Sequence, residues 1–178
     1  MKTGVCVAVM ILSAAALARA EEAKMQFALT SPNFRNNQPM PAKHSCEGAD
    51  ASPALKWEGA PAGTKSFALI CDDPDAPGGS WVHWVIYEIP ANAKELPEGF
   101  AKSDVAAGAK QGMNDFGKVG YGGPCPPRGH GVHHYHFRLY ALDTDLNLAA
   151  RVTRRQLEAA MKGHILGQTE LVGTYQRD

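Results

Sequence analysis

The residues best suited to chemistry lie at the beginning of two apolar segments. His133 and Tyr135 belong to RGHGVHHYHFRLYALD, in which four histidines crowd the start of an apolar run. Asp73 and His83 belong to DDPDAPGGSWVHWVIYEIP, in which acidic residues precede a glycine-rich turn and a second apolar run. Imidazole and phenol groups donate hydrogen bonds to anionic oxygens, and a nearby carboxylate holds an imidazole in its donating tautomer. This combination predicts a site for a phosphate-type anion.

Strand periodicity indicates how these side chains are presented. Alternate residues of a strand share a face, so His133 and Tyr135 should share one face with the apolar residues that follow them. Trp81 and Trp84 are interpreted as packing residues, because Trp84 falls on the opposite strand face from His83 in strict alternation. Polar residues gathered where two core strands begin predict a pocket at one end of a sandwich.

The strands and helix expected around these groups indicate a mainly β fold. It should be an antiparallel β-sandwich with one or two helices in the C-terminal half. The expected strands are 25–30, 55–57, 65–72, 82–89, 133–142 and 165–175. A helix should begin after Thr153, with Gln156 completing a capping box, and end at Gly163.

Three other stretches have no regular period. We expect residues 31–53 to form surface loop or an irregular edge strand, and residues 91–118 to make a long excursion over the surface. Residues 119–131 are rich in glycine and proline and should form a shaped loop that leads the chain to His133.

The segments DPDAP at 73–77, WVHW at 81–84 and GPCPPRG with HHYHFRLYALD resemble the two signature regions of the phosphatidylethanolamine-binding protein family, also called Raf kinase inhibitor-like proteins. The pattern C-x-G-x-x-x-S-P-x-L-x-W at 46–57 is similar to the bacterial and archaeal branch of that family, and the resemblance covers residues 25–176. It implies a large antiparallel sheet packed on a smaller one, with a small anion pocket at one end.

The resemblance also implies the ligand-binding residues. They are Asp73, His83, Pro127, His133 and Tyr135, with the proline on the rim. We interpret Asp73 as the group that orients His83 or His133, or as the partner of the ammonium in a phosphoethanolamine head group. At His134 the sequence departs from relatives that often carry arginine, which makes any charge there pH-dependent. His44 and His130 are loop residues and are assigned no role.

Two other classes of function were weighed against anion binding. His134 and His136 form an H-x-H pair near His130 and His133, which could suit zinc, but strand phase separates His133 from that pair; no metal ligand is therefore assigned. An enzyme is not expected, because the sequence has no G-x-S-x-G elbow, P-loop, H-E-x-x-H or Rossmann pattern. No catalytic residue and no cofactor are assigned.

The resemblance implies one further alternative, protein inhibition, because relatives are described as inhibitors of kinases or proteases that act through the surface around the pocket. For an exported chain the target would be extracytoplasmic. The sequence does not identify such a partner and leaves the oligomeric state open.

Residues 1–20 have the pattern of a secretory signal peptide, with Lys2, an apolar run and an A-x-A site ending at Ala20. We therefore expect residues 21–178 to form a single exported domain, periplasmic or secreted and without a membrane span. Cleavage would remove Lys2 and Arg19 and leave 16 basic residues against 18 acidic ones, a net charge near −2. Without a basic excess, a nucleic-acid partner is not expected.

Three cysteines would remain after cleavage. Cys71 lies in the apolar run SFALIC and is expected to be a buried thiol. Cys46 and Cys125 lie in turn-rich segments, and an oxidising compartment favours a disulfide between them, with two free thiols as the alternative.

Overall fold

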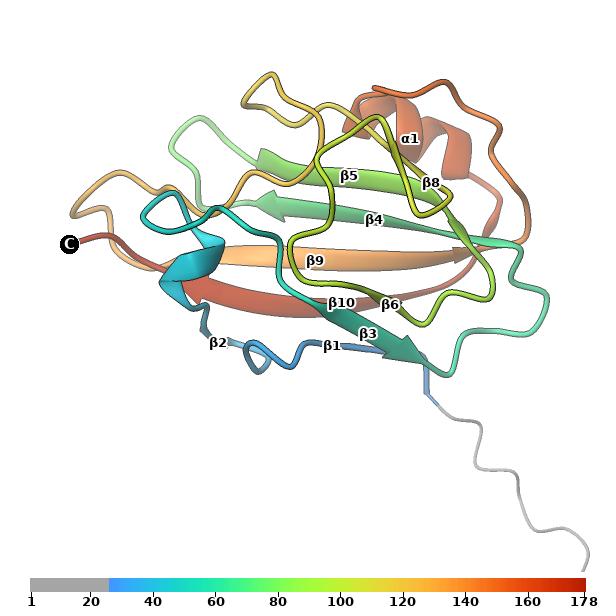
Figure 1. Cartoon of the computed structure of the whole chain (residues 1–178), viewed down its shortest axis with the longest axis horizontal. Coiled ribbons are helices and arrows are strands. Elements are labelled where there is room, and N and C mark those ends of the chain that lie inside the picture. The colour runs from blue at the N-terminus through green and yellow to red at the C-terminus, as the bar shows by residue number, and fades with distance from the viewer. Residues whose placement is uncertain (1–25) are drawn as a thin grey trace, which may run out of the picture.

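A computed structural model describes residues 26–178, which fold into two packed sheets and one α-helix (Figure 1). The predicted signal peptide at residues 1–20 lies outside the described residues. The strands are β1 (Ala28–Thr30), β2 (Gln38–Pro39), β3 (Leu55–Glu58), β4 (Ser66–Asp73), β5 (Trp81–Pro90), β6 (Glu95–Leu96), β7 (Val105–Ala106), β8 (Ala109–Gln111), β9 (His133–Leu142) and β10 (Ile165–Tyr175). A 3-10 helix spans Ala42–His44, and α1 spans Arg154–Met161. No helix within residues 26–178 has the length and apolar character needed to cross a bilayer.

The sheets differ in size, as expected for a large sheet packed on a smaller one. The small sheet has the order β1-β3-β6, and the large one has the order β2-β10-β9-β4-β5-β8-β7. Among these pairs only β2 with β10 is parallel, and β2 lies at the edge of the large sheet. The predicted mainly antiparallel sandwich is therefore confirmed.

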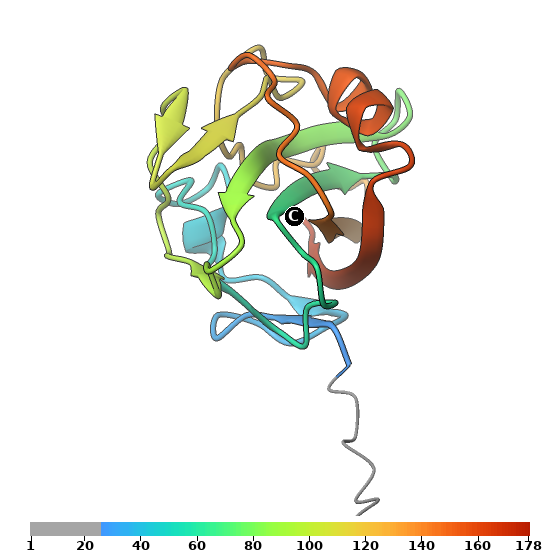
Figure 2. The ribbon, with the colours of Figure 1, turned by 90° about the vertical axis from the view of Figure 1, so that its right-hand side faces the viewer.

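Strand β4 is buried along its whole length because both of its faces are covered. Phe67 and Leu69 face the core between the two sheets, whereas Ala68 and Ile70 face a second apolar cluster under α1. Figure 2 shows α1 outside the large sheet, next to β5, with β1 and β3 on the other side. A strand in the middle of three layers needs apolar residues at both phases, which is why SFALIC does not alternate.

The helix begins as the sequence predicts. The Thr153 hydroxyl accepts a hydrogen bond from the Gln156 backbone, and the Gln156 side chain accepts one from the Thr153 backbone, so the capping box forms. Leu157 and Met161 are buried against the sheet. The helix ends at Met161, two residues before Gly163, which adopts a left-handed backbone with φ 85°.

The expectation that residues 91–118 form a surface excursion is wrong for the parts of the segment that form β6, β7 and β8. Strand β6 joins the small sheet, and β8 pairs with β5 in the large one. Gln111 of β8 is fully buried, and its side chain accepts a hydrogen bond from the Trp84 indole at 2.8 Å. Short two- and three-residue strands carry too little periodicity to be found from sequence, since their position depends on pairing with distant residues.

Candidate functional site

A cavity of about 210 Å³ lies at the end of the large sheet where β4 ends and both β5 and β9 begin, the left-hand end in Figure 1. Its lining contains all five ligand-binding residues predicted from the sequence. The lining residues are Asp73, Ala76, Pro77, Trp81, His83, Phe116, Cys125, Pro126, Pro127, His133 and Tyr135. Antiparallel pairing of β4 with both β5 and β9 brings the strand residues of this lining together, and the loops after β4, β8 and Gly122 supply the others.

His83 is aimed into the cavity by a β-bulge. Cys71 pairs with Trp84 and Asp72 pairs with Val82, so His83 is an extra residue on β5 without a partner on β4. A bulge locally breaks the alternation of side chains and re-aims one of them. Trp84 packs in the core between the sheets, while His83 packs edge-on against Tyr135 of the same face, with ring centroids 5.0 Å apart. Trp84 and His83 therefore do not lie on the opposite faces that strict alternation predicts, although Trp84 is a packing residue as predicted.

The role of Asp73 is decided by one short contact. Its Oδ2 lies 2.7 Å from Nδ1 of His133, and both side chains are buried. Because a carboxylate accepts and does not donate, Nδ1 of His133 carries the hydrogen, and Nε2 is the nitrogen directed away from the carboxylate. Of the two orienting roles considered for Asp73, the structure shows the one toward His133.

His83 is held by the backbone instead. Its Nδ1 donates to the carbonyl oxygen of Gly122 at 2.6 Å, which leaves Nε2 for a ligand. Burial lowers the pKa of His83, and the Gly122 bond and the charge of Asp73 oppose that effect only in part. The neutral ring is therefore favoured, and it offers a lone pair at Nε2.

The Tyr135 hydroxyl is a buried polar group without a partner. The side chain is 1% exposed, and the hydroxyl makes no hydrogen bond to any of residues 26–178. Burial, followed by the negative charge of Asp73, raises the pKa of Tyr135, so the phenol keeps its proton and acts as a donor. Buried hydroxyls are nearly always paired, so the Tyr135 hydroxyl is a donor that remains available in the cavity wall.

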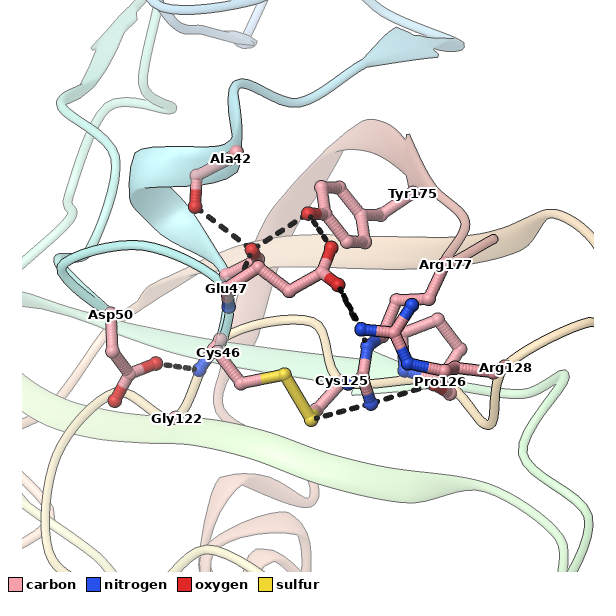
Figure 3. Close-up of a disulfide and its surroundings, with 12 residues drawn as sticks. Ala42, Cys46, Glu47, Asp50, Gly122, Cys125, Pro126, Arg128, Tyr175 and Arg177 are labelled. Carbon is pink, nitrogen blue, oxygen red and sulfur yellow. Dashed lines mark hydrogen bonds and ion pairs between the residues drawn. A yellow bond between two sulfur atoms is a disulfide. The ribbon is translucent and has the colours of Figure 1, made fainter.

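The rim of the cavity is attached to two distant parts of the chain (Figure 3). A disulfide joins Cys46 to Cys125, with Cα atoms 5.4 Å apart, and Cys71 is the buried free thiol, so both cysteine predictions are confirmed. Arg177 donates to the Pro126 carbonyl at 3.3 Å and to Glu47 at 3.3 Å. The prolines beside His133 are therefore fixed by both the disulfide and the C-terminal segment.

Two aromatic residues of the cavity were not assigned to it from the sequence. Phe116, from the loop after β8, packs edge-on against His83 and Trp81 with ring centroids 5.4 and 5.5 Å apart. A Cβ atom at Gly122 would lie 2.6 Å from the Phe116 ring, so only glycine permits this wall. Trp81 lines the cavity beside Asp73, its partner in the β4–β5 pairing. The sequence could not place Phe116 in the cavity, because the region around it has no regular hydrophobic period.

Two histidines that were assigned no role have specific contacts. His44 is fully buried, with Nδ1 2.8 Å from the Ala51 carbonyl and Nε2 without a hydrogen bond in the described chain. His130 is exposed, yet its Nδ1 lies 2.7 Å from Nε2 of His133. In the sequence, the close spacing of His130 and His133 was the signal that could have indicated their contact.

The remaining histidines of the motif have separate partners. His134 contacts Asp75 at 2.7 Å and His136 contacts Glu170 at 2.9 Å. Across residues 26–178, no group of three or more His, Cys, Asp and Glu side chains is arranged as a metal site. The H-x-H pair is thus engaged by carboxylates on β10 and on the loop after β4.

Known proteins are similar to this chain in sequence and in fold. The model of the family described as phosphatidylethanolamine-binding protein matches residues 30–176. The UPF0098 protein of Aquifex aeolicus is 51% identical over 149 residues, which cover 83% of this chain and 87% of the relative. A UPF0098 protein of Pyrococcus horikoshii is 52% identical over 159 residues, covering 88% and 79% of the two chains.

Two solved structures support the same relationship. The crystal structure of Escherichia coli YbcL, described as a member of the mammalian PEBP family, has a TM-score of 0.80 at 35% identity and covers 85% of this chain and 99% of its own. A structure from Chlamydia trachomatis, described as a homologue of phosphatidylethanolamine-binding protein, has a TM-score of 0.78 at 41% identity and covers 85% and 98%.

Proposed function

Because the chain belongs to the phosphatidylethanolamine-binding protein family, we propose that it is an exported binding protein whose cavity takes a phosphate-type anion, such as the phosphate of a phospholipid head group. The observation that supports this most is the Tyr135 hydroxyl, a buried donor with no partner in the described chain. A ligand oxygen that accepts from it would satisfy this buried hydroxyl, which residues 26–178 leave unpaired.

The polarity of the site favours an anion that also carries a hydrogen. Tyr135 donates, and His133 donates from Nε2 when its ring is protonated, with Asp73 balancing the charge at Nδ1. Neutral His83 accepts at Nε2, which matches the P–OH group of a singly protonated phosphate. A carboxylate or a fully ionised phosphate offers no such hydrogen.

Asp73 is screened from the ligand by its contact with His133, so its negative charge does not have to oppose the anion directly. We propose binding without catalysis, because the cavity lacks a nucleophile. Asp73 and His133 have the geometry of an acid–base pair, but within residues 26–178 the cavity lining contains no serine, threonine or free cysteine.

The test is calorimetric titration of residues 21–178 with inorganic phosphate and with O-phosphoethanolamine. His133→Ala should weaken binding of both roughly tenfold or more, as expected for loss of a charged hydrogen bond. His164→Ala is the matched control, because His164 is an exposed histidine paired with Asp143 at the opposite end of β9. Absence of binding by the unmodified chain, or equal loss in both variants, would contradict the anion site. A hydrolytic rate that His133→Ala abolishes would contradict binding without catalysis.

A second function, inhibition of an extracytoplasmic protein, is favoured by the mouth of the cavity. Trp81 is 38% exposed and Phe116 is 40% exposed, and together they form an apolar rim around the polar floor. Exposed apolar rims of this kind occur where partners bind. If a partner uses this rim, a Trp81→Ser, Phe116→Ser double variant should lose a crosslinked species that the unmodified protein forms in periplasmic extract. A crosslinking pattern shared by both proteins would remove this candidate.

A further inference from the structure

Both ring nitrogens of His133 are already in contact with the protein. Nδ1 lies 2.7 Å from Asp73 Oδ2, and Nε2 lies 2.7 Å from Nδ1 of His130. His133 lines the cavity, and Nε2 is the ring nitrogen that Asp73 does not hold. The nitrogen through which His133 would hold an anion is therefore occupied by a second imidazole.

The two contacts at Nε2 exclude each other. Each imidazole nitrogen has one position in the ring plane, which holds either a hydrogen or a lone pair. In the observed contact that position is directed at His130. An anion bound to His133 must accept the Nε2 hydrogen at the same position, so the His130 ring has to leave before the anion can bind.

His130 is placed so that it can leave. It lies in an exposed loop between Gly129 and Gly131, both with a left-handed backbone, and a Cβ added at either glycine would meet no atom within 4 Å. The backbone of the loop is anchored, since Gly129 N–H donates to the Arg177 carbonyl at 3.0 Å and His130 N–H to the Pro127 carbonyl at 3.2 Å. Rotation of the His130 side chain into solvent is thus sufficient, without movement of the cavity wall.

Resting on the anion site proposed above, we propose that His130 is a competitor built into the protein: the anion takes the place of the His130 imidazole at His133 Nε2. The ligand is a phosphate monoanion, so a charged acceptor takes the place of the neutral His130 imidazole. His130 therefore sets a threshold against weakly accepting neutral ligands, which gain too little at Nε2 to displace the ring.

The charged and titratable groups around the contact are consistent with this exchange. Asp73 contacts His133 from the β4 side, and His83 and Tyr135 face the same cavity from β5 and β9. On the loop after β4, Asp75 is engaged by His134.

The test compares the affinity of His130→Ala with that of the unmodified protein, both as residues 21–178, for inorganic phosphate and O-phosphoethanolamine at pH 7. Displacement predicts that His130→Ala binds both ligands about 3- to 10-fold more tightly, the range that one hydrogen bond of ordinary net strength represents. His164→Ala should leave both affinities unchanged, since its histidine pairs with Asp143 at the other end of the sheet. A ring ¹⁵N spectrum should show the His130 nitrogens shifting to values of a solvent-exposed histidine as phosphate is added.

The other outcomes contradict either the displacement or the anion site itself. Weaker binding by His130→Ala would make His130 a ligand of the anion, and equal binding would show that the contact does not compete; either overturns the displacement and leaves the anion site standing. If neither the unmodified protein nor His130→Ala binds either ligand, the anion site itself is wrong.

Discussion

Asp72 and Asp73 are neighbours in sequence, but their carboxylates act on opposite faces of β4. Asp73 contacts His133 in the cavity at 2.7 Å. Asp72 is directed to the outer face, where it accepts hydrogen bonds from Arg138, from Arg154 at 2.8 Å and from Ser80 at 2.6 Å. Two carboxylates of the same chemistry therefore have separate partners, one in the cavity and the other on the outer face of the sheet.

This division predicts different effects of the same substitution. Asp72→Asn should lower the free energy of unfolding by about 1.5–3 kcal/mol, because a buried acceptor of charged hydrogen bonds loses its charge, and should leave phosphate affinity unchanged. Asp73→Asn should weaken phosphate binding, because His133 loses the carboxylate that orients its ring through Nδ1. Urea denaturation and calorimetry of both variants check the pair; reversed or identical effects would show that the two carboxylates do not have separate roles.

Tyr135→Phe should weaken phosphate binding by about 0.5–1.5 kcal/mol without loss of stability. The hydroxyl has no partner among residues 26–178, so its removal costs no intramolecular hydrogen bond. Thermal unfolding should give a melting temperature equal to or above that of the unmodified protein. As a control, Tyr87→Phe removes a hydroxyl that donates to the Ala149 carbonyl and should lower stability but not affinity. A destabilised Tyr135→Phe would mean that the hydroxyl is satisfied within the fold.

Acid should destabilise the protein through buried histidines. Burial lowers the pKa of both His44 and His83 in the folded chain. In the unfolded chain both regain a value near about 6.5, so below that pH the unfolded state binds more protons and unfolding is favoured. The free energy of unfolding should therefore be level above about pH 7.5 and fall as pH drops through about 6.5. His83→Gln should show a shallower fall between pH 7.5 and 5; an unchanged slope would contradict a neutral His83.

The disulfide should contribute a large part of the stability. Cys46 and Cys125 are 79 residues apart, and the chain-entropy model assigns a loop of this size about 4.5 kcal/mol as an upper value. Unfolded, unreduced protein comprising residues 21–178 should contain one reactive thiol, that of Cys71, and reduction should raise the count to three. Three thiols before reduction would show that the bridge does not form in solution.

The N-terminal segment should be removed on export. Intact-mass measurement of periplasmic material should give a chain that begins at Glu21, because the A-x-A pattern ends at Ala20. Retention of Met1 in that material would contradict both the cleavage and the assigned compartment.

Several features of this protein follow from the sequence by itself, because they depend on local properties of the chain. The side-chain period of a strand is two, so the order of residues from His133 onward was enough to predict which of them are buried. The capping box at Thr153 joins groups only three residues apart. The family motifs identified the fold and five of the eleven residues that line the cavity.

Other features depend on which distant segments meet, and only the tertiary structure decided them. The bulge that aims His83 arises from the register of β5 against β4, which no pattern within β5 records. Phe116 reaches the cavity because the loop after β8 folds over Gly122. His130 meets His133 because Arg177 of the C-terminal segment anchors the loop at Gly129. In each case the deciding free energy comes from contacts between segments far apart in the chain, and the sequence of one segment does not contain them.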